Sequence, residues 1–517
     1  MSGQEMHLCA FHQVFLRTAL FPPPQQSGML KRRWYLFIMV ALVVRGLYIG
    51  IQHHYRPGQD LPGVLSLESG DTKGYLDPVE NLIDQGRYEP DYRMPGVAAP
   101  YWLFRQFLGP GASRDAMVLL QWLLSAINVY VLALIALRMT GSERIALLVY
   151  IAFLISAYSS WFDPIIASDS LSISALILHV HFLQSALDRG SQGRLLLSGS
   201  FLAWFVFLRP IGVLLVPLAA ALILLRRTTP RPWRSALMLA LPFLVLDGVW
   251  TARNLSVHGS FSPLTNQGWF PEDFSREIRA HAMHFVQGYG GNYIWWHPGS
   301  DIRWYGVWKG GATIDDEGRL AKAPPPYAYV EGYTPADLGA LSDRVRSLER
   351  GRSSPTDSLA EVVSINARFD ELAGLYKERA PFQYHVLSRF RMFKNLVWQN
   401  GTESLIIVPF DQLPLWAKVF KLVQVMAYVL SFIIGTIACV MLLWRWRSPP
   451  TVLHLWVPFI MAYLVLIFPF ALRMCEWRYM AHPFPFALLL AVILLARKGR
   501  MSAGHQAAGA RTLVNGR

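Results

Sequence analysis

The 517-residue sequence predicts an all-α polytopic membrane protein with about ten transmembrane helices and a mostly helical extracytoplasmic domain. Hydrophobic residues make up 53% of the chain and charged residues 16%, whereas soluble domains carry about 25% charged residues. The mean hydropathy is +0.29. The three cysteines, Cys9, Cys439 and Cys475, are too few and too far apart for a disulfide framework or a zinc knuckle.

Apolar runs define the membrane-spanning elements in chain order. Each expected span is long enough, or nearly long enough, to cross about 30 Å of hydrocarbon. The ten expected spans cover residues 34–51, 116–138, 145–160, 169–187, 195–208, 211–225, 235–250, 421–443, 453–472 and 481–496.

Basic residues indicate which ends of the spans are cytoplasmic. Lys31, Arg32 and Arg33 precede the first span, and arginines also follow the even-numbered spans, so both termini are predicted to be cytoplasmic. The outer loop 52–114 has 6 basic and 8 acidic residues, and the outer segment 251–414 has 17 and 18, which leaves 25 basic and 8 acidic residues elsewhere. The net charge of the chain is +14, and the excess of basic residues faces cytoplasmic anionic lipids. A nucleic-acid partner is not expected, because its contacts would need the cations gathered on one accessible face.

This pattern predicts five regions in a multi-pass protein of the inner (plasma) membrane. A tail (1–30) precedes a transmembrane module (31–250) that contains the outer loop 52–114. An extracytoplasmic domain (251–414), C-terminal helices (415–500) and a cytoplasmic tail (501–517) follow. In the outer domain, Ser358 and Glu361 have capping-box spacing, and residues 382–397 have an amphipathic pattern suited to the membrane interface, with Phe390 and Phe393 inward and Arg389 towards the headgroups.

Short motifs at the outer ends of the spans carry the functional information. Their order along the chain is Gly70-Asp71-Thr72-Lys73-Gly74-Tyr75, Leu82-Ile83-Asp84-Gln85-Gly86-Arg87-Tyr88, Arg93-Met94-Pro95-Gly96, Ala167-Ser168-Asp169-Ser170, Phe207-Leu208-Arg209-Pro210, Trp250-Thr251-Ala252-Arg253-Asn254 and Glu476-Trp477-Arg478-Tyr479. In this order and spacing they resemble the type C integral-membrane glycosyltransferases, in particular the branch that contains protein O-mannosyltransferases and the aminoarabinose transferases that modify lipid A.

The resemblance implies an inverting sugar transfer from a polyprenyl-phosphate donor to an extracytoplasmic acceptor, which is a lipid, a glycan or a protein. Asp71 matches the family's catalytic acid and would be the general base; the alternative is that it caps a helix beginning at Thr72. Asp169 lies where the family usually has a second acid, often glutamate. It would tune Asp71, bind a divalent cation or cap its own helix.

Four arginines are the candidates for holding the donor phosphate: Arg93, before Pro95-Gly96 in the first outer loop, and Arg209, Arg253 and Arg478 at outer span ends. Arginine suits bidentate phosphate contact. The alternative for each is a snorkelling anchor in the lipid interface. Tyr75, Tyr479 and Glu476 are the expected substrate-positioning residues, with Glu476 orienting Arg478 through an ion pair.

Two further patterns leave their functional role open. The aromatic cluster 295–308 suits a sugar ring or prenyl tail, or else an aromatic belt at the headgroup level. Glu277, His281 and His284 have a spacing that a helix would place on one face, as for zinc, or as a solvated polar face. We expect no metal and no cofactor. Rival functions are an O-antigen ligase or polymerase and a transporter or flippase of a lipid-linked sugar, which would favour paired broken helices at mid-membrane.

Overall fold

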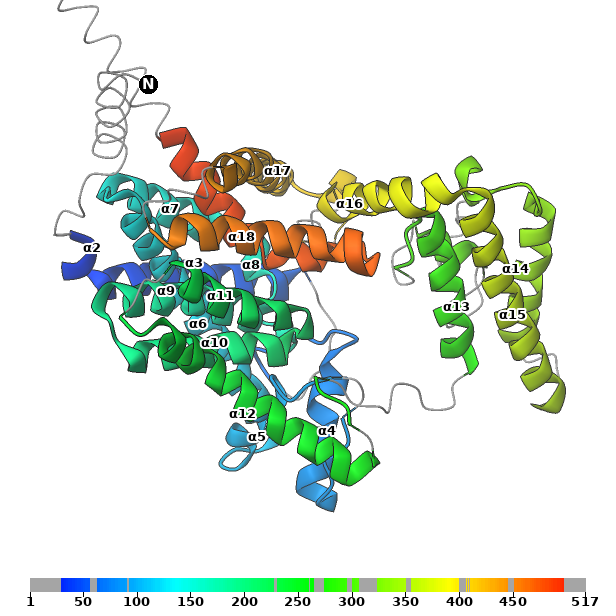
Figure 1. The fold of residues 1–517 in the computed structure, drawn as a ribbon, viewed down its shortest axis with the longest axis horizontal. Helices are drawn as coiled ribbons and strands as arrows, with labels where there is room; N and C mark the ends of the chain where they lie inside the picture. The colour runs from blue at the N-terminus through cyan, green and yellow to red at the C-terminus, as the bar shows by residue number, and fades with distance from the viewer. Residues whose placement is uncertain are drawn as a thin grey trace, which may run out of the picture. The chain divides into compact units, whose positions relative to one another are not determined.

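In the computed structural model, every element of regular secondary structure among the described residues is a helix (Figure 1). The structure describes residues 29–55, 63–90, 93–226, 230–259, 261–264, 274–294, 300–305, 323–349, 355–398, 406, 408, 410–444 and 451–496. Within these ranges the only β pairing consists of two isolated bridges, Leu67 with Ile165 and Val330 with Tyr333. The all-α class predicted from the sequence is confirmed.

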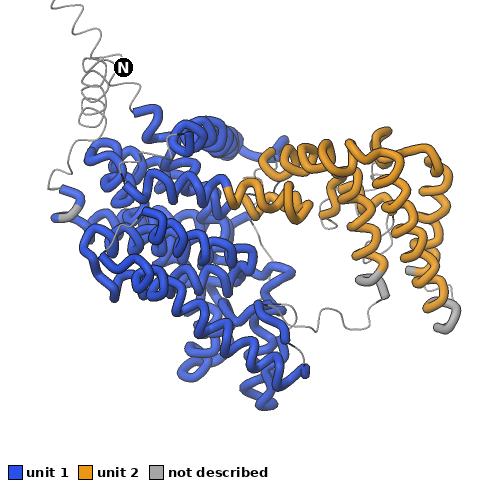
Figure 2. The backbone as a smooth tube through the Cα atoms, viewed as in Figure 1, with its two compact units in different colours: residues 1–267, 401–462, 481–517 blue, residues 268–400, 463–480 orange. Residues whose placement is uncertain are grey.

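The chain divides into two compact units (Figure 2): residues 1–267, 401–462 and 481–517 form unit 1, and residues 268–400 and 463–480 form unit 2. The helical elements of unit 1 are α2 (Met29–Arg32), α3 (Trp34–His54), α4 (Thr72–Gln85), α5 (Ala98–Arg105), α6 (Pro110–Thr140), α7 (Glu143–Ile155), α8 (Ala157–Ser160), α9 (Ser168–Arg189), α10 (Gln192–Leu208), η1 (Pro210–Leu214), α11 (Leu215–Arg226), α12 (Pro232–His258), η6 (Phe410–Gln412), α17 (Leu415–Trp444) and Phe484–Ala496.

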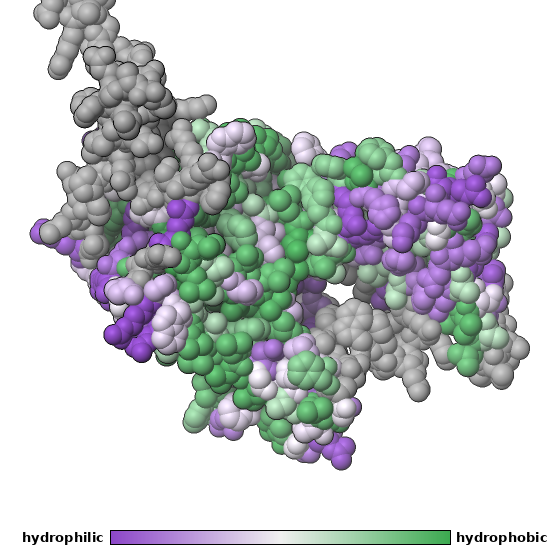
Figure 3. Space-filling model, in the orientation of Figure 1, coloured by the Kyte–Doolittle hydropathy of each residue, from purple (hydrophilic) through white to green (hydrophobic). Residues whose placement is uncertain are grey.

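Unit 2 contains α13 (Phe274–Tyr289), η2 (Asp301–Tyr305), η3 (Pro326–Ala328), α14 (Pro335–Glu349), α15 (Pro355–Arg379), η4 (Gln383–Leu387), α16 (Ser388–Trp398) and η7 (Ile467–Leu472). The long helix α18 (Leu453–Leu466) begins in unit 1 and ends in unit 2, and η8 (Trp477–Ala481) runs from unit 2 back into unit 1. On the face shown in Figure 3, hydrophobic residues cover most of unit 1, whereas hydrophilic residues predominate on unit 2.

Nine of the ten predicted spans coincide with apolar helices among the described residues. Six are long and apolar enough to cross a membrane: α3, α6, α9, α12, α17 and α18 continued to Leu472. Three shorter apolar helices, Gln192–Leu208, Pro210–Arg226 and Phe484–Ala496, match three further predicted spans. The protein is thus a polytopic membrane protein, as the sequence predicts.

The predicted span 145–160 is wrong as a single helix, because α7 ends at Ile155 and α8 begins at Ala157. Ser156 between them has an extended backbone (ψ 116°). The main-chain groups that the break exposes are bound by side chains: Tyr48 donates to Ile155 O (2.7 Å), and Gln424 donates to the same oxygen while accepting from Ala157 N. Such substitute partners allow a helix to break among apolar helices.

Helix α9 is the buried centre of unit 1: in its most apolar stretch, 83% of the residues are buried. It packs along α10 and α6. Its His179 binds Ser198 of α10 and accepts a hydrogen bond from the Trp456 indole of α18 (3.0 Å). These polar contacts fix the position of α9, whose first turn carries Asp169.

Unit 2 is organised around α13 and α15. One apolar face of α15 consists of Val362, Ile365, Phe369, Leu372 and Tyr376, and all five residues are buried. Helix α15 begins at Pro355, so the capping box predicted at Ser358 is wrong: Ser358 lies inside the helix. The earlier start is explained by Pro355, since proline suits the first turn of a helix.

The segment predicted as an interfacial helix, 382–397, is helical as η4 and α16, and its inner side packs through the fully buried Met392 and Leu396. Phe390 and Phe393 both contact the Phe470 ring of η7. Arg389 donates to the Phe470 main-chain oxygen. The position of this helix at a membrane surface stays a prediction.

Candidate active site

Asp71 lies at the start of α4, and its carboxylate forms an ion pair. Asp71 Oδ1 accepts a hydrogen bond from Arg93 Nη2 at 2.7 Å. Asp71 occupies the N-cap position of α4, but its side chain makes no capping hydrogen bond. The capping alternative for Asp71 is therefore not observed, because the carboxylate faces a guanidinium instead of the amide groups of the first turn.

Local features of the first outer loop explain how Arg93 reaches Asp71. Gly74 lies against the Arg93 guanidinium, and a Cβ at Gly74 would collide with it. The Arg93 guanidinium also lies over the Tyr75 ring, 5.0 Å from its centroid, as in a cation–π contact. Gly74 and Tyr75 of the first motif thus position Arg93 of the third motif.

Tyr75 connects this ion pair to the start of α9. Its hydroxyl donates to Ser168 Oγ at 3.0 Å. The neighbouring Leu67–Ile165 bridge and the small apolar cluster that includes Ala167 join the same two segments. Segments almost 100 residues apart in the sequence therefore hold Asp71 and Asp169 in one region of unit 1.

Asp169 is almost completely enclosed, with 2% of its side chain exposed, and it pairs with Arg209. Ala167 occupies the N-cap position of α9 and Asp169 lies in the first turn. The capping alternative for Asp169 is therefore not observed either. A carboxylate in the first helical turn is still favoured by the helix dipole, but the guanidinium supplies the charge that a buried carboxylate needs.

Arg209 leaves the end of α10 with an extended backbone (φ −145°, ψ 91°), after which Pro210 opens η1. Gly96 lies against this turn: a Cβ there would be 2.6 Å from the Phe207 main-chain oxygen. Trp204 of α10 donates to the Gly96 oxygen (3.0 Å). The Pro-Gly turn of the first loop is thus packed directly onto the backbone that positions Arg209.

Arg253, near the end of α12, is held by the same loop. It donates to Tyr88 O (2.6 Å) and to Asn254 Oδ1 (3.0 Å). Its guanidinium lies over the Trp250 ring at 5.1 Å, and Trp250 packs in an apolar cluster with Met94 and Phe207. Five of the six predicted arginine and aspartate residues, Asp71, Arg93, Asp169, Arg209 and Arg253, are therefore gathered in unit 1.

The remaining predicted residues belong to unit 2. The predicted ion pair between Glu476 and Arg478 is present, and Glu476 is buried. Tyr479 stacks on Phe468, with ring centroids 4.2 Å apart and planes 10° apart. A role of these three residues in binding substrate stays a prediction.

Arg45 and Asp163 are buried charged residues that were missed from the sequence. Arg45 of α3 is fully buried and donates to Phe153 O (2.8 Å) and Ser159 Oγ (3.1 Å). Asp163 accepts from Ser170 Oγ (2.8 Å), next to Asp169. A lone arginine within the apolar run 34–51 was the available signal, because intramembrane ionisable residues are rarely incidental.

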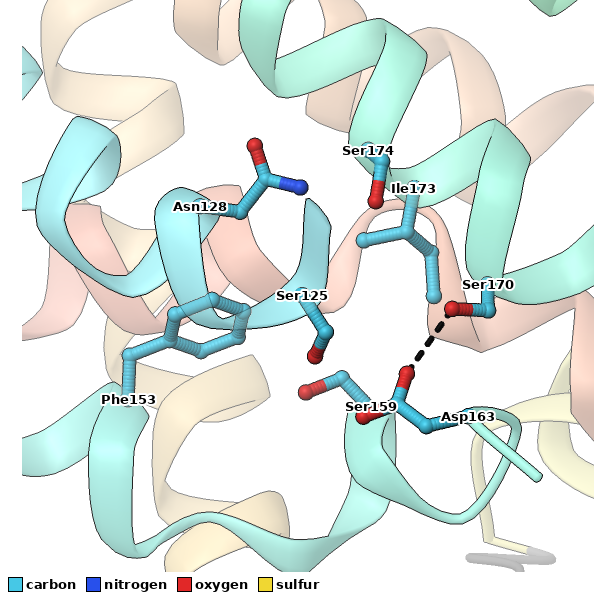
Figure 4. A pocket seen from close by; sticks show the side chains of 8 residues that line it. All are labelled: Ser125, Asn128, Phe153, Ser159, Asp163, Ser170, Ile173 and Ser174. Atoms are coloured by element: carbon cyan, nitrogen blue, oxygen red, sulfur yellow. Dashed lines mark hydrogen bonds between the residues drawn. The ribbon is translucent and has the colours of Figure 1, made fainter. Parts of the chain in front are cut away.

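Figure 4 shows Asp163 among the hydroxyl groups of Ser125, Ser159 and Ser174 and the Asn128 amide, all lining a cavity of ≈ 10 Å³. That volume suits a single water molecule. Ser170, Ile173 and Ser174 of α9 line the cavity, so it lies beside the first turns of the helix that carries Asp169.

The described residues contain no group of three or more His, Cys, Asp or Glu side chains that could hold a metal ion. His281 instead pairs with Asp370 (2.8 Å), whereas the Glu277 side chain lies outside the described residues. Most of the aromatic cluster 295–308 also lies outside them. Tyr305 of that cluster is a core residue of unit 2 beside Phe285 and Phe369, not a surface for a sugar ring.

No protein-family model and no curated protein matches the chain. Among solved structures, the chain is similar to the oligosaccharyltransferase AglB from Archaeoglobus fulgidus in complex with an inhibitory peptide and a dolichol-phosphate (TM-score 0.43, 10% identity, 93% of this chain and 52% of that chain). It is also similar to ArnT from Cupriavidus metallidurans in the apo state (0.35, 15%, 90% and 78%) and bound to undecaprenyl phosphate (0.32, 14%, 89% and 77%). The chain spans about half the length of AglB. Both neighbours are type C glycosyltransferases, the class that the motifs resemble.

Proposed function

We propose that the protein transfers a sugar from a polyprenyl-phosphate donor to an acceptor on the extracytoplasmic side of the inner membrane. One observation carries the proposal. Two acid–arginine pairs, Asp71 with Arg93 and Asp169 with Arg209, are joined through the Tyr75–Ser168 hydrogen bond.

The reaction is a displacement at the anomeric carbon of the sugar. Asp71 acts as the general base that takes the proton from the acceptor hydroxyl, a role worth roughly 10²–10⁴-fold in rate. The bond from the anomeric carbon to the phosphate oxygen breaks as the bond to the acceptor oxygen forms, so the sugar configuration is inverted. The electrons of the broken bond leave with the lipid phosphate.

The arginines of unit 1 stabilise that phosphate. Fixed positive charge aimed at a developing negative charge is a major source of rate enhancement in a site shielded from water. Arg93 contacts Asp71 directly, so an arriving phosphate shares or takes over this guanidinium, and Asp71 then becomes available to the acceptor hydroxyl. Arg209 remains with the buried Asp169 and adds charge without moving. Arg253 completes the candidate set within unit 1, and Arg478 of unit 2 stays a separate candidate.

The ordered motifs, which resemble the type C enzymes, support the proposed donor. Two of the neighbouring structures named above contain dolichol-phosphate or undecaprenyl phosphate. We propose that catalysis needs no metal or cofactor, that the acceptor is a lipid, glycan or protein outside the cytoplasm, and that both termini are cytoplasmic.

The test is transfer by the purified full-length protein supplied with defined polyprenyl-phosphate sugars and candidate acceptors, with products identified by mass spectrometry. Asp71→Asn should lower turnover at least about 100-fold while donor binding persists. Asp77→Asn is the matched control, because Asp77 is an exposed residue of the same helix. Normal turnover by Asp71→Asn would refute the assignment of the base. Movement of the donor across vesicle membranes without any product would indicate a transporter instead.

A further inference from the structure

Three cations of unit 2 gather around one aromatic ring where the α18 span ends. The Arg473 guanidinium lies 3.7 Å from the Tyr384 ring centroid, and Lys377 Nζ lies 6.0 Å from it. Arg473 also donates to the Tyr384 main-chain oxygen (3.4 Å). Arg389, one helical turn beyond Tyr384, donates to Phe470 O of η7. Figure 1 shows α16 beside the end of α18.

Lys377, Arg389 and Arg473 form a cation cluster, and none of the ion pairs between described residues includes any of the three. Partial burial and then the nearby positive charge of Arg473 lower the pKa of Arg389. Residues 377–398 carry five basic residues and one acidic residue. The charges therefore repel one another and favour an anion.

Arg473 occupies a position that suits glycine better than arginine. It follows the last turn of η7 with φ 55°, ψ 44°, the left-handed region, and Met474 N then binds Phe468 O (2.8 Å) to close the helix end. Left-handed conformations are unfavourable for residues other than glycine and recur at ligand clamps. An arginine retained there at an energetic cost indicates a use for its side chain.

The cluster also lies at a defined depth. Helix α18 and η7 together form the candidate span Leu453–Leu472, so Arg473 directly follows this candidate span, and a membrane crossed by it would have its headgroups near Arg473. Apolar side chains around it are exposed in this structure: Phe382, Phe390, Leu466 and Leu472. Exposed apolar residues beside cations are typical of a surface that meets lipid.

We propose that Lys377, Arg389 and Arg473 bind the phosphate group of an anionic phospholipid in the extracytoplasmic leaflet. Arginine forks match phosphate oxygens in a bidentate manner, and the exposed apolar residues contact the acyl chains. The site binds bilayer lipid and does not depend on the proposed sugar transfer. It would anchor η4 and α16 to the membrane surface.

The test measures binding of phosphatidylglycerol to the purified full-length protein by native mass spectrometry, with phosphatidylcholine as the neutral comparison. Arg389→Gln and Arg473→Gln should each weaken phosphatidylglycerol binding about fivefold, the equivalent of the contribution of one cation near an anionic surface. Arg379→Gln is the matched control: Arg379 is an exposed cation two residues from Lys377, about 200° around the helix. It should bind like the wild type.

Salt gives a second measurement that needs no variant: raising the salt concentration should weaken phosphatidylglycerol binding by the wild-type protein. Equal binding of phosphatidylglycerol and phosphatidylcholine, unchanged binding by the Arg389→Gln/Arg473→Gln double variant, or binding insensitive to salt would each overturn the proposal. A site that takes a short polyprenyl phosphate and rejects phosphatidylglycerol would also overturn it, in favour of the donor's carrier lipid.

Discussion

The buried pair of Asp169 and Arg209 gives a quantitative test of the site architecture. The perturbations are Asp169→Asn, which removes the charge at nearly constant size, Arg209→Gln, which removes the charge and shortens the side chain, and the double variant. Removing one member of a buried ion pair costs about 3–5 kcal/mol because the other charge is left uncompensated. The two single variants should nevertheless differ, because the two side chains are 2% and 14% exposed.

Arg209→Gln leaves the more deeply buried charge, the Asp169 carboxylate, and should cost about 3–5 kcal/mol. Asp169→Asn leaves a guanidinium that is partly hydrated and still finds the Asn oxygen as an acceptor, so about 1–3 kcal/mol is expected. The double variant buries no unpaired charge and should cost no more than Asp169→Asn. The coupling energy is then at least about 3–5 kcal/mol in magnitude, well above the roughly 0.5 kcal/mol expected of independent sites.

The assay is unfolding of each purified variant in detergent micelles, followed by tryptophan fluorescence over a denaturant titration. Two results would refute the reasoning: a cost for Asp169→Asn that equals or exceeds that of Arg209→Gln, or additive costs in the double variant. Additivity would mean that the two residues do not interact in solution, and that Asp169 has another stabilising role.

Three further predictions concern the first outer loop and one concerns metal. Gly96→Ala should destabilise the protein by about 1–3 kcal/mol, measured as a lower melting temperature, because its Cβ would meet Phe207 O at 2.6 Å. Arg93→Gln should weaken donor binding about ten- to 100-fold, the range of a charge-assisted hydrogen bond; unchanged affinity would exclude Arg93 from the phosphate site. The hydrogen bond from Arg105 lowers the pKa of Glu80. The pair should therefore contribute about 1 kcal/mol to the free energy of unfolding above pH 4.5, and this contribution should be lost on acidification. In Glu80→Gln the melting temperature should fall less steeply as the pH is lowered. Transfer activity should survive chelator treatment, and loss of activity with rescue by magnesium or manganese would show that a metal takes part.

How far the sequence predicts the site depends on the range of the interaction concerned. The residues Asp71, Arg93, Asp169, Arg209 and Arg253 were all selected from short motifs, and the Glu476–Arg478 pair was predicted because the two residues are close neighbours in the chain. Which arginine pairs with which aspartate was not predictable, since each of the two pairs joins different helices or loops. The sequence did not predict the buried positions of Arg45 and Asp163, because each is a single charged residue outside any motif.

Hydrophobic composition and the positions of arginines, which act locally along the chain, were sufficient to predict a polytopic helical membrane protein and most of its spans. The break at Ser156 depends instead on long-range contacts, because Tyr48 and Gln424 supply the hydrogen bonds that a continuous helix would have made within itself. The same holds for both acids: capping is a local property of the sequence, but the enclosed Asp169 carboxylate and the Asp71 carboxylate lie beside guanidinium groups brought there by tertiary folding. A charge removed from water is stabilised by the nearest opposite charge in space, and only the tertiary structure decides which residue that is.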